Sequence, residues 1–233
     1  MKRKQTMPGK TDLEKKYFDI NAYAFIEKLR LQIHRKVIQI LKMYDRLDLK
    51  DIVYTCVKEL VINGTKAMVK RIVFAENNLD IDDPDDWEKG TAIFKNKLRE
   101  SYIEEFAKKT KSLNFKVKIR YIYNVKGMRV EVINNTPIPR IDEKRMRGKL
   151  SKAMRYNSIG DYYMDNADDI EGVGMGLAFI VILLKNQGLD PQYLRIGTIG
   201  DQTIARVEFP FKEDYIPYRD IKYKEKLIKD TSH

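Results

Sequence analysis

The chain has 233 residues, of which 43% are hydrophobic and 34% charged, and its formal net charge is +11. This length fits one large domain or two small ones, and the hydrophobic content is sufficient for a real core. A single cysteine, Cys56, excludes an internal disulfide and a cysteine-based zinc site. No apolar run approaches the roughly 18 residues of a membrane span, and the basic N-terminus has no apolar segment typical of a secretory signal. We therefore expect a soluble, cytoplasmic protein.

The excess of basic residues leaves room for an anionic partner, such as a nucleotide, a nucleic acid, an acidic protein or an anionic membrane surface. Much of it is lysine spread through amphipathic segments and both tails. The chain contains no recognisable nucleic-acid-binding motif, and its aromatic residues do not cluster as stacking platforms. A lysine-rich, solvated surface is therefore favoured over dedicated nucleic-acid binding.

The chain begins with a predicted mobile basic arm, residues 1–17, followed by a helix over residues 20–44 with Asn21 as its N-cap. The apolar stripe of this helix suits either pairing between protomers in a homodimer or burial against the same domain. A second, strongly apolar helix is expected from about residue 48 or 51 to residue 75.

An acidic, polar segment follows the second helix. Pro84 and the aspartates around it predict a loop over residues 77–90, and a third helix is expected over residues 91–111. Alternating apolar residues then predict two strands, 115–123 and 128–133, joined by the hairpin turn N-V-K-G.

The remaining elements are predicted from residue 134 onward. The stretch N-N-T-P-I-P breaks the second strand, and residues 140–171 are expected to form a mobile loop with one short helix. A glycine run and an apolar helix to about residue 186 come next, and two strands, 193–199 and 203–211, close the chain.

This order does not alternate strand and helix as a doubly wound sheet would. It predicts an α+β fold, a two-layer sandwich with helices on one face of a mixed, mostly antiparallel sheet. No G-x-x-x-x-G-K-[ST] sequence is present, which excludes a P-loop. The expected division of the chain is an arm, an N-terminal helix, a main domain with an inserted acidic loop and helix, and a charged tail: 1–17, 18–46, 47–212 with the insertion 77–112, and 213–233.

The segment G-V-G-M-G-L-A-F-I, which begins at Gly172, alternates three glycines with apolar residues and leads into a helix pattern. Such a segment brings backbone N–H groups close to a ligand at the positive N-terminus of a helix, where phosphate commonly binds. By itself the run equally fits a flexible turn before a buried helix.

The second predicted helix carries the sequence E-L-V-I-N-G-T-K, which begins at Glu59. Glu59 and Asn63 share one face of the helix, with Lys66 and Lys70 on the same side. A carboxylate, an amide and ammonium groups together suit a magnesium–phosphate site, in which Asn63 ligates Mg²⁺ and Glu59 orients or deprotonates a nucleophile. Taken alone, the stripe also fits an exposed surface.

Together these segments resemble the GHKL ATPase superfamily, which includes gyrase, histidine kinases and mismatch-repair ATPases. The N box of that family, E-x-x-x-N-A, is matched by Glu59 and Asn63, and glycine replaces its alanine at Gly64. Lys66 stands where histidine kinases commonly have a lysine. The last glycine box, G-x-G-x-G-L, is matched by Gly172, Gly174, Gly176 and Leu177. The order and approximate spacing agree from about residue 48 to residue 211.

The resemblance implies a Bergerat-type ATP-binding fold with ATP and Mg²⁺ as cofactors. It implies Glu59 as the catalytic residue and Asn63 as the Mg²⁺ ligand. The closing strand, which begins near G-D-Q-T, is similar to the family's final strand, in which a threonine often reaches towards adenine. The nucleotide contacts that the resemblance implies are Asn63, Lys66, Asn134, Gly172, Gly174, Met175, Gly176, Leu177 and Thr203.

One element departs from the family pattern. After the second strand the family usually has D-x-G-x-G, whose aspartate accepts a hydrogen bond from the adenine amino group. Here Asn134 stands at the aspartate position and Thr136 at the first glycine. A neutral amide accepts a weaker hydrogen bond than a carboxylate does, so we expect weaker adenine binding or an altered base preference.

Three further features are compared with what the family resemblance implies. Its lid corresponds to residues 140–171, where five basic residues are candidates for phosphate contacts or solvated charges: Arg145, Arg147, Lys149, Lys152 and Arg155. His34 lacks the acidic residue and proline that usually follow a phosphoaccepting histidine, so a helix-surface or dimer-face position is favoured. Cys56 lies on the apolar stripe and is expected in the core.

The sequence therefore predicts a stand-alone signalling kinase or ATPase of the histidine-kinase or anti-sigma-factor type. Its expected partners are a nucleotide, a signalling or regulatory protein and, through the N-terminal helix, a second copy of the chain. The alternative is a degenerate, non-catalytic GHKL module that acts through protein contacts, with weak or no nucleotide binding. The altered adenine box and the long insertion at residues 77–112 favour this alternative.

Overall fold

The computed structural model describes residues 14–99, 103–166 and 175–222. In this part of the chain five strands form one sheet: β1 (Lys16–Ala22), β2 (Val117–Asn124), β3 (Gly127–Asn134), β4 (Arg195–Ile199) and β5 (Gln202–Pro210). Their order is β1-β2-β3-β5-β4, and every neighbouring pair is antiparallel. The predicted α+β class is confirmed, and the described sheet is antiparallel throughout rather than mixed.

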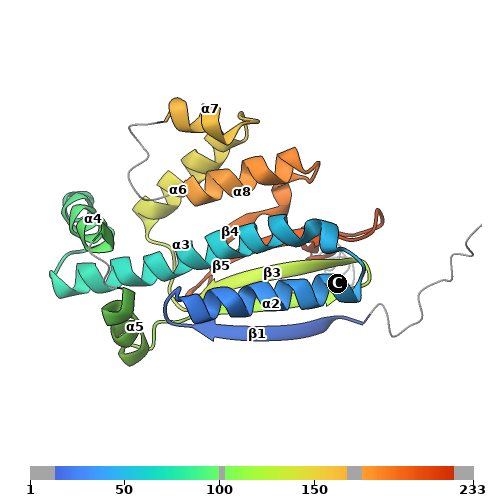
Figure 1. The fold of residues 1–233 in the computed structure, drawn as a ribbon. Coiled ribbons are helices and arrows are strands. Elements are labelled where there is room, and N and C mark those ends of the chain that lie inside the picture. The colour runs from blue at the N-terminus through green and yellow to red at the C-terminus, as the bar shows by residue number, and fades with distance from the viewer. Residues whose placement is uncertain (1–13, 100–102, 167–174, 223–233) are drawn as a thin grey trace, which may run out of the picture.

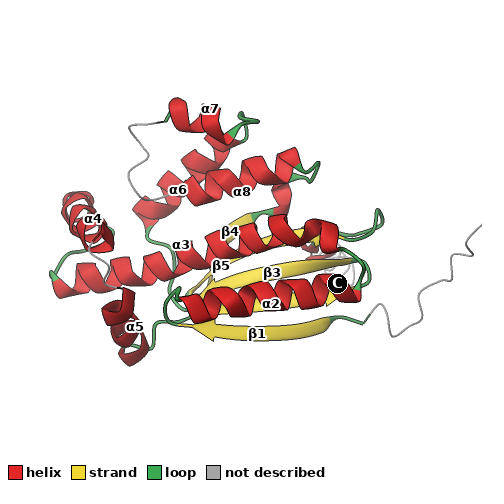
Figure 2. Cartoon of the chain, in the orientation of Figure 1, coloured by secondary structure: helices red, strands yellow, loops and turns green. Residues whose placement is uncertain are grey.

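Helices form the second layer (Figures 1 and 2). They are α2 (Glu27–Met43), α3 (Lys50–Glu76), α4 (Pro84–Arg99), α5 (Ile103–Ser112), α6 (Arg140–Ala153), α7 (Ile159–Met164) and α8 (Met175–Asn186), with 3-10 turns η1 (Leu47–Leu49) and η3 (Pro191–Tyr193). Helices α2, α3 and α8 cover one face of the sheet. Helices α4 and α5 flank the C-terminal half of α3, whereas α6 and α7 lie beside α8 (Figure 1).

The main core lies between the sheet and α2, α3 and α8. Helix α3 is its centre because apolar residues occur on most of its surface, and Val53, Cys56 and Val57 are fully buried. The expected core position of Cys56 is confirmed, and burial raises the pKa of its thiol. The predicted extents of α3 and of the β2–β3 hairpin agree with the structure to within a few residues.

The N-terminal prediction is partly wrong. Residues 16–22 form β1, an edge strand paired with β2, whereas the sequence pattern predicted a helix from residue 20 with Asn21 as its N-cap. The sequence K-Y-F-D-I-N-A buries Ile20 and Ala22 on alternate positions, as a strand requires. Helix α2 begins at Glu27, and its apolar stripe is buried in the core of the same domain. His34 lies on this helix, edge-on to the Tyr54 ring at 5.1 Å between centroids.

The insertion forms two helices where a loop and one helix were predicted. Helix α4 begins at Pro84, inside the expected loop, because the side chain of Asp83 accepts hydrogen bonds from the backbone N–H groups of Asp85 and Asp86 at 3.0 Å. An aspartate cap followed by proline is a strong helix start. Gly90 lies inside α4, where a Cβ would be 2.4 Å from the Phe74 ring. This glycine therefore permits close packing of α4 on α3, and it does not mark the end of the predicted loop.

The segment 140–171 is also more ordered than predicted. Residues 140–153 form α6 and residues 159–164 form α7. Acidic residues in the first turn of α6 and an ion pair between Arg147 and Glu143 at 2.6 Å stabilise that helix. The expected single short helix is therefore corrected to two helices.

The described part of the charged tail packs against the sheet face opposite the helices. The Tyr218 ring lies 3.8 Å from the guanidinium carbon of Arg129 and 4.8 Å from that of Arg206. Glu208, which is 1% exposed, accepts hydrogen bonds from the Tyr215 hydroxyl and the Tyr218 backbone N–H. Contacts of Tyr215 and Tyr218 thus tie the tail to β3 and β5.

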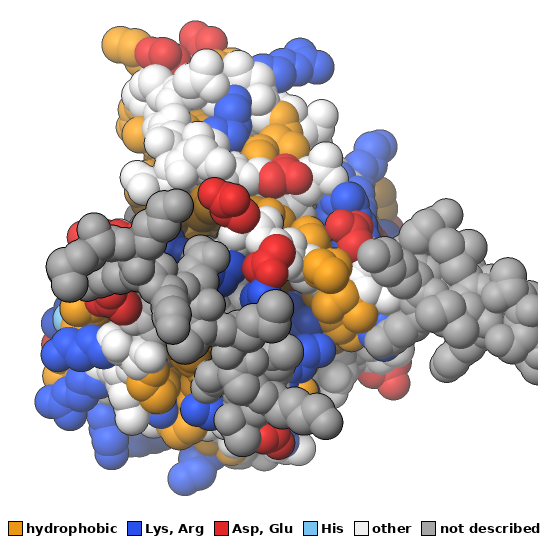
Figure 3. Space-filling model, turned by 90° about the vertical axis from the view of Figure 1, so that its right-hand side faces the viewer, with side chains coloured by type: hydrophobic (Ala, Val, Ile, Leu, Met, Phe, Trp, Pro, Cys, Tyr) orange, Lys and Arg blue, Asp and Glu red, His pale blue; other side chains and the backbone are white. Residues whose placement is uncertain are grey.

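Surface charge is mixed on the face shown in Figure 3. Lys and Arg side chains occur along its lower left edge and at scattered positions, with Asp, Glu and apolar side chains between them. Within the described residues, no helix combines the length and the apolar character needed to cross a bilayer.

Candidate functional site

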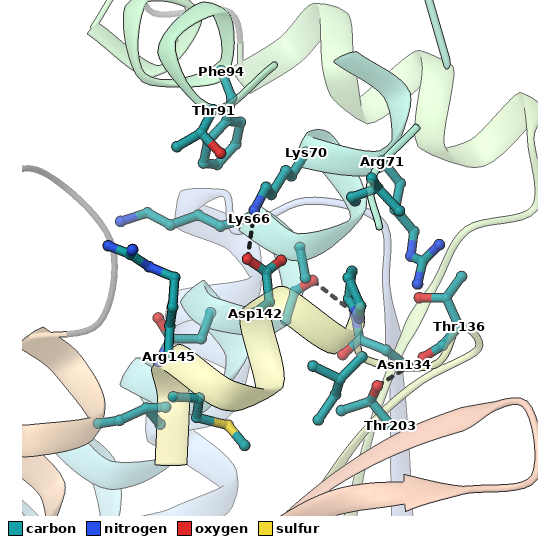
Figure 4. A pocket seen from close by; sticks show the side chains of 18 of the residues that line it. Lys66, Lys70, Arg71, Thr91, Phe94, Asn134, Thr136, Asp142, Arg145 and Thr203 are labelled. Carbon is teal, nitrogen blue, oxygen red and sulfur yellow. Dashed lines mark hydrogen bonds and ion pairs between the residues drawn. The ribbon is translucent and has the colours of Figure 1, made fainter. Parts of the chain in front are cut away.

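A cavity of about 550 Å³ lies between α3, α4, α6 and the ends of β3 and β5. Its volume is within the range of small-molecule binding sites. Five of the predicted nucleotide contacts line it: Asn63, Lys66, Asn134, Leu177 and Thr203. Segments that are distant in sequence therefore contribute to one pocket, as Figure 4 shows for the residues from α3, α6 and the two strands.

Glu59 and Asn63 lie against the first turn of α8. A Cβ at Gly176 would be 2.6 Å from Oε2 of Glu59 and 3.5 Å from Nδ2 of Asn63, so a side chain at position 176 would collide with the carboxylate. The Glu59 side chain is 20% exposed, and its Oε1 is 3.2 Å from Nζ of Lys58. Asn63 Nδ2 is buried and has no hydrogen-bond partner within the described structure. An unpaired buried amide is costly, and a polar ligand would satisfy it.

Asn134 is buried at the end of β3, where its side chain bonds to helix α3. Its Nδ2 donates to the backbone carbonyl of Gly64 at 2.8 Å, and its Oδ1 is 2.8 Å from the position of a Cβ on Gly64 (Figure 4). The amide therefore fills the space that an alanine in the N box would use. An aspartate could not donate to this carbonyl in its ionised form.

Thr203 pairs with Asn134 across β3 and β5. Its Oγ1 donates to the carbonyl of Thr136 at 2.7 Å, and its backbone N–H donates to the same oxygen at 3.0 Å. The side-chain donors of Asn134 and Thr203 are thus both bonded to backbone carbonyls at this end of the cavity.

The cavity wall is basic. Six basic residues line it, against two acidic ones: Lys66, Lys70, Arg71, Lys95, Arg145 and Lys149, with Glu88 and Asp142. Arg71 also donates to the carbonyl of Pro137, and burial lowers the pKa of its guanidinium. This surplus of positive charge suits a ligand with several negative charges.

A cluster of polar and aromatic groups joins three helices at the cavity. Nζ of Lys70, which is 6% exposed, lies 2.6 Å from Oδ1 of Asp142 and 4.4 Å from the centre of the Trp87 ring. Trp87 Nε1 donates to the same Asp142 oxygen at 2.8 Å. Burial lowers the pKa of Lys70, and the nearby Asp142 carboxylate partly opposes this effect. The cluster ties α3, α4 and α6 together.

The candidate lid bases separate into two groups. Arg145 and Lys149 line the cavity, and the Arg145 guanidinium carbon is 4.7 Å from the Trp87 ring centre. Arg147 instead pairs with Glu143, and neither Lys152 nor Arg155 belongs to the cavity wall. Only two of the five candidates are therefore placed for direct ligand contact.

Not every predicted residue can be placed. Gly172 and Gly174 lie outside the described residues. Met175 is the first residue of α8 but does not line the cavity, whereas Leu177 does. Of the predicted glycine box, the described part therefore contributes the close approach of Gly176 and the apolar contact of Leu177.

Trp87 and Asp142 were not identified from the sequence. Both fall in segments predicted to be loops, 77–90 and 140–171. The sequence D-P-D-D-W-E contained a usable signal, because an aspartate before a proline is typical of a helix start. With that helix recognised, Trp87 falls in its first turns, but its contact with Lys70 depends on tertiary packing.

The described residues contain no group of three or more His, Cys, Asp and Glu side chains that would enclose a metal ion. Asn63 nonetheless offers its Oδ1 as a hard oxygen ligand of the kind Mg²⁺ prefers, and its unpaired Nδ2, a hydrogen-bond donor, suits a phosphate oxygen. Because Mg²⁺ commonly keeps several waters and binds phosphate oxygens, a site with few protein ligands is compatible with a magnesium–phosphate complex.

Comparison with known proteins gives one informative match. The chain is 31% identical over 191 residues to an uncharacterized protein of Treponema pallidum (strain Nichols). The matched region is 82% of this chain but 37% of that protein, so the chain spans little more than a third of its relative's length. No family model and no solved structure matches the chain.

Proposed function

We propose that the cavity binds Mg-ATP and that the chain is a GHKL-type signalling kinase or ATPase. The observation that carries this proposal is the meeting of Glu59 and Asn63 with Gly176. Gly176 is distant in sequence from Glu59 and Asn63, and the three residues come from the two motifs that carry the resemblance. Their contact puts a carboxylate, an unpaired amide and the beginning of a helix side by side.

The chemistry of the cavity supports a nucleotide as the ligand. Its basic lining suits the triphosphate, and its apolar residues suit a base. Asn63 would hold Mg²⁺ together with phosphate and water oxygens, and the metal would neutralise charge on the phosphates. Glu59 would orient a water or hydroxyl nucleophile and accept its proton.

Calorimetric titration with ATP, with and without Mg²⁺, tests binding directly. A ligand at a hundredfold its dissociation constant stabilises the fold by about 2.7 kcal/mol, so thermal unfolding provides a second readout. Asn63→Ala is expected to weaken Mg-ATP binding, whereas Asn157→Ala, an exposed loop change, is the matched control. Wild-type chain that binds no ATP at millimolar concentration would refute the proposal.

Turnover requires a separate measurement. Glu59→Gln keeps the size of the side chain and removes its basicity, so we expect retained ATP binding and a roughly hundredfold or greater loss of phosphate release or transfer. Equal turnover in the wild type and in this variant would remove Glu59 from the reaction.

A second candidate is a non-catalytic module that binds a protein partner and binds nucleotide weakly or not at all. It is favoured by the commitment of Asn134 Nδ2 and Thr203 Oγ1 to backbone carbonyls, since neither donor is directed to a base. Binding of ATP without turnover in the wild type, unchanged in Glu59→Gln, would select this candidate. A pull-down that returns no protein partner would weaken it.

A further inference from the structure

Trp87 is the only tryptophan of the chain, and it is half-buried in the wall of the proposed nucleotide cavity. It belongs to α4, in the insertion that the sequence pattern did not connect with ligand binding. Helix α4 is firmly packed, because Phe94 is buried with Ile72 and Val73 of α3 in a small separate core. The indole therefore projects from a fixed support.

The orientation of the indole is also fixed. Its Nε1 donates to Asp142, and Asp142 is held in turn by Lys70. Lys70 and Arg145 both lie within 5 Å of the ring centre, at 4.4 and 4.7 Å. Both cations lie over the ring as cation–π partners, and an aromatic ring with neighbouring cations is the arrangement on which nucleic-acid bases stack.

The position of Trp87 along α3 separates it from the proposed reacting end. Lys70 follows Glu59 by eleven residues, which corresponds to about 16 Å along the axis of a helix. Glu59 and Gly176 mark the phosphate end, so Trp87, in contact with Lys70, lies towards the other end of the cavity. A nucleotide with its phosphates near Gly176 would extend its base in this direction.

We propose that Trp87 is a base-contacting residue and that the heterocyclic base of a nucleotide stacks on its indole ring in the cavity. This inference rests on the proposed function and adds to it a specificity-determining residue from the inserted helix. The nucleotide site is then shared between the α+β domain and its insertion.

Intrinsic fluorescence tests this directly, because Trp87 is the sole tryptophan. The probes are ATP, adenosine and inorganic triphosphate. We expect ATP and adenosine to change the emission saturably and triphosphate to leave it unchanged. The control is the double variant Trp87→Phe/Tyr17→Trp, in which the reporter is moved to an exposed residue of β1 and should not respond to any probe.

Two substitutions separate stacking from a purely structural role. Trp87→Leu removes the aromatic ring and is expected to weaken ATP binding by roughly tenfold or more, as loss of a base–aromatic stack does. Trp87→Phe keeps a ring but removes the N–H that donates to Asp142, so it should retain most of the affinity. Unfolding curves establish that each variant is folded before its calorimetric titration.

The failures are distinguishable. If calorimetry detects ATP binding but Trp87→Leu binds as the wild type does, or if triphosphate alone changes the emission, the base-contact inference is wrong and the proposed function survives. Equal losses in Trp87→Phe and Trp87→Leu would assign Trp87 to holding Asp142 and would also overturn the inference. Absence of ATP binding by the wild type refutes both proposals.

Discussion

Replacing Asn134 by aspartate restores the residue of the GHKL pattern, yet we expect it to destabilise the protein. Asn134 is 4% exposed and its Nδ2 donates to the Gly64 carbonyl at 2.8 Å. Loss of this hydrogen bond costs about 1 kcal/mol. The new carboxylate would also be buried and directed at a carbonyl oxygen, which raises its pKa in the folded state.

The pH dependence follows from that shift. Each unit by which the carboxyl pKa rises costs about 1.4 kcal/mol once the group is ionised in both states. With a rise of roughly two units, typical of a buried carboxyl, the total penalty is about 4 kcal/mol at pH 8. Because the folded state holds the proton more tightly, the penalty grows as pH rises from the unfolded-state pKa through the folded-state pKa. At pH 4.5 it should fall to about 2 kcal/mol.

Urea unfolding of the wild type and Asn134→Asp at pH 4.5 and pH 8 measures both terms. Asn157→Asp adds the same charge at an exposed loop position and controls for net charge. An Asn134→Asp variant as stable as the wild type at both pH values would refute the reasoning. So would a difference that does not depend on pH, because it would show that the carboxylate is not buried.

Three other changes test packing and buried charge. Gly90→Ala puts a Cβ 2.4 Å from the buried Phe74 ring, so it should lower the unfolding free energy by about 2 kcal/mol despite its better helix propensity, and a more stable variant would contradict the packing. The pKa of Lys70 is lowered in the folded protein, so unfolding takes up a proton. The stability of the wild type should therefore rise with pH between that lowered pKa and about 10.5. Lys70→Met should flatten this rise, and equal slopes in the two proteins would refute the pKa shift. Glu208→Ala leaves Arg206, its partner at 3.2 Å, unpaired and mostly buried, so chemical denaturation should show a loss of about 3 kcal/mol, and a neutral result would show that solvent reaches the arginine.

The elements that could be predicted are those with strong local patterns. Helix α3 is apolar over its whole length, and the β2–β3 hairpin has alternating strands and a short turn. Strand β1 was missed because its pairing with β2 joins residues about a hundred positions apart, for which no local pattern exists. Helix α4 was shortened because Gly90 resembles a loop glycine until Phe74 is seen against it.

The site was predictable to the extent that its residues belong to motifs. Asn63, Lys66, Asn134 and Thr203 were predicted from the resemblance to the GHKL motifs, and all four line one cavity. What their side chains contact was not predictable, because the bond of Asn134 to Gly64 depends on the distance between β3 and α3. Trp87 could not be identified for the same reason, since its place in the cavity wall arises from helix packing.

Gly64 and Asn134 are the two departures from the family motifs that the structure brings into contact. A Cβ at Gly64 would be 2.8 Å from Asn134 Oδ1, so neither residue can be restored to the family pattern without affecting the other. The two departures are therefore one change in how the cavity wall is packed. In the double variant, the added Cβ at position 64 would displace the carboxylate at position 134 from the carbonyl of residue 64 towards the cavity, so each change relieves part of the cost of the other. We expect Gly64→Ala/Asn134→Asp to be less destabilised than the sum of its single variants, by 0.5 kcal/mol or more in a double-mutant cycle measured by urea unfolding. Strict additivity would show that the two positions are independent. The contribution of the family's aspartate to nucleotide binding should therefore be measured in the double variant rather than in Asn134→Asp alone.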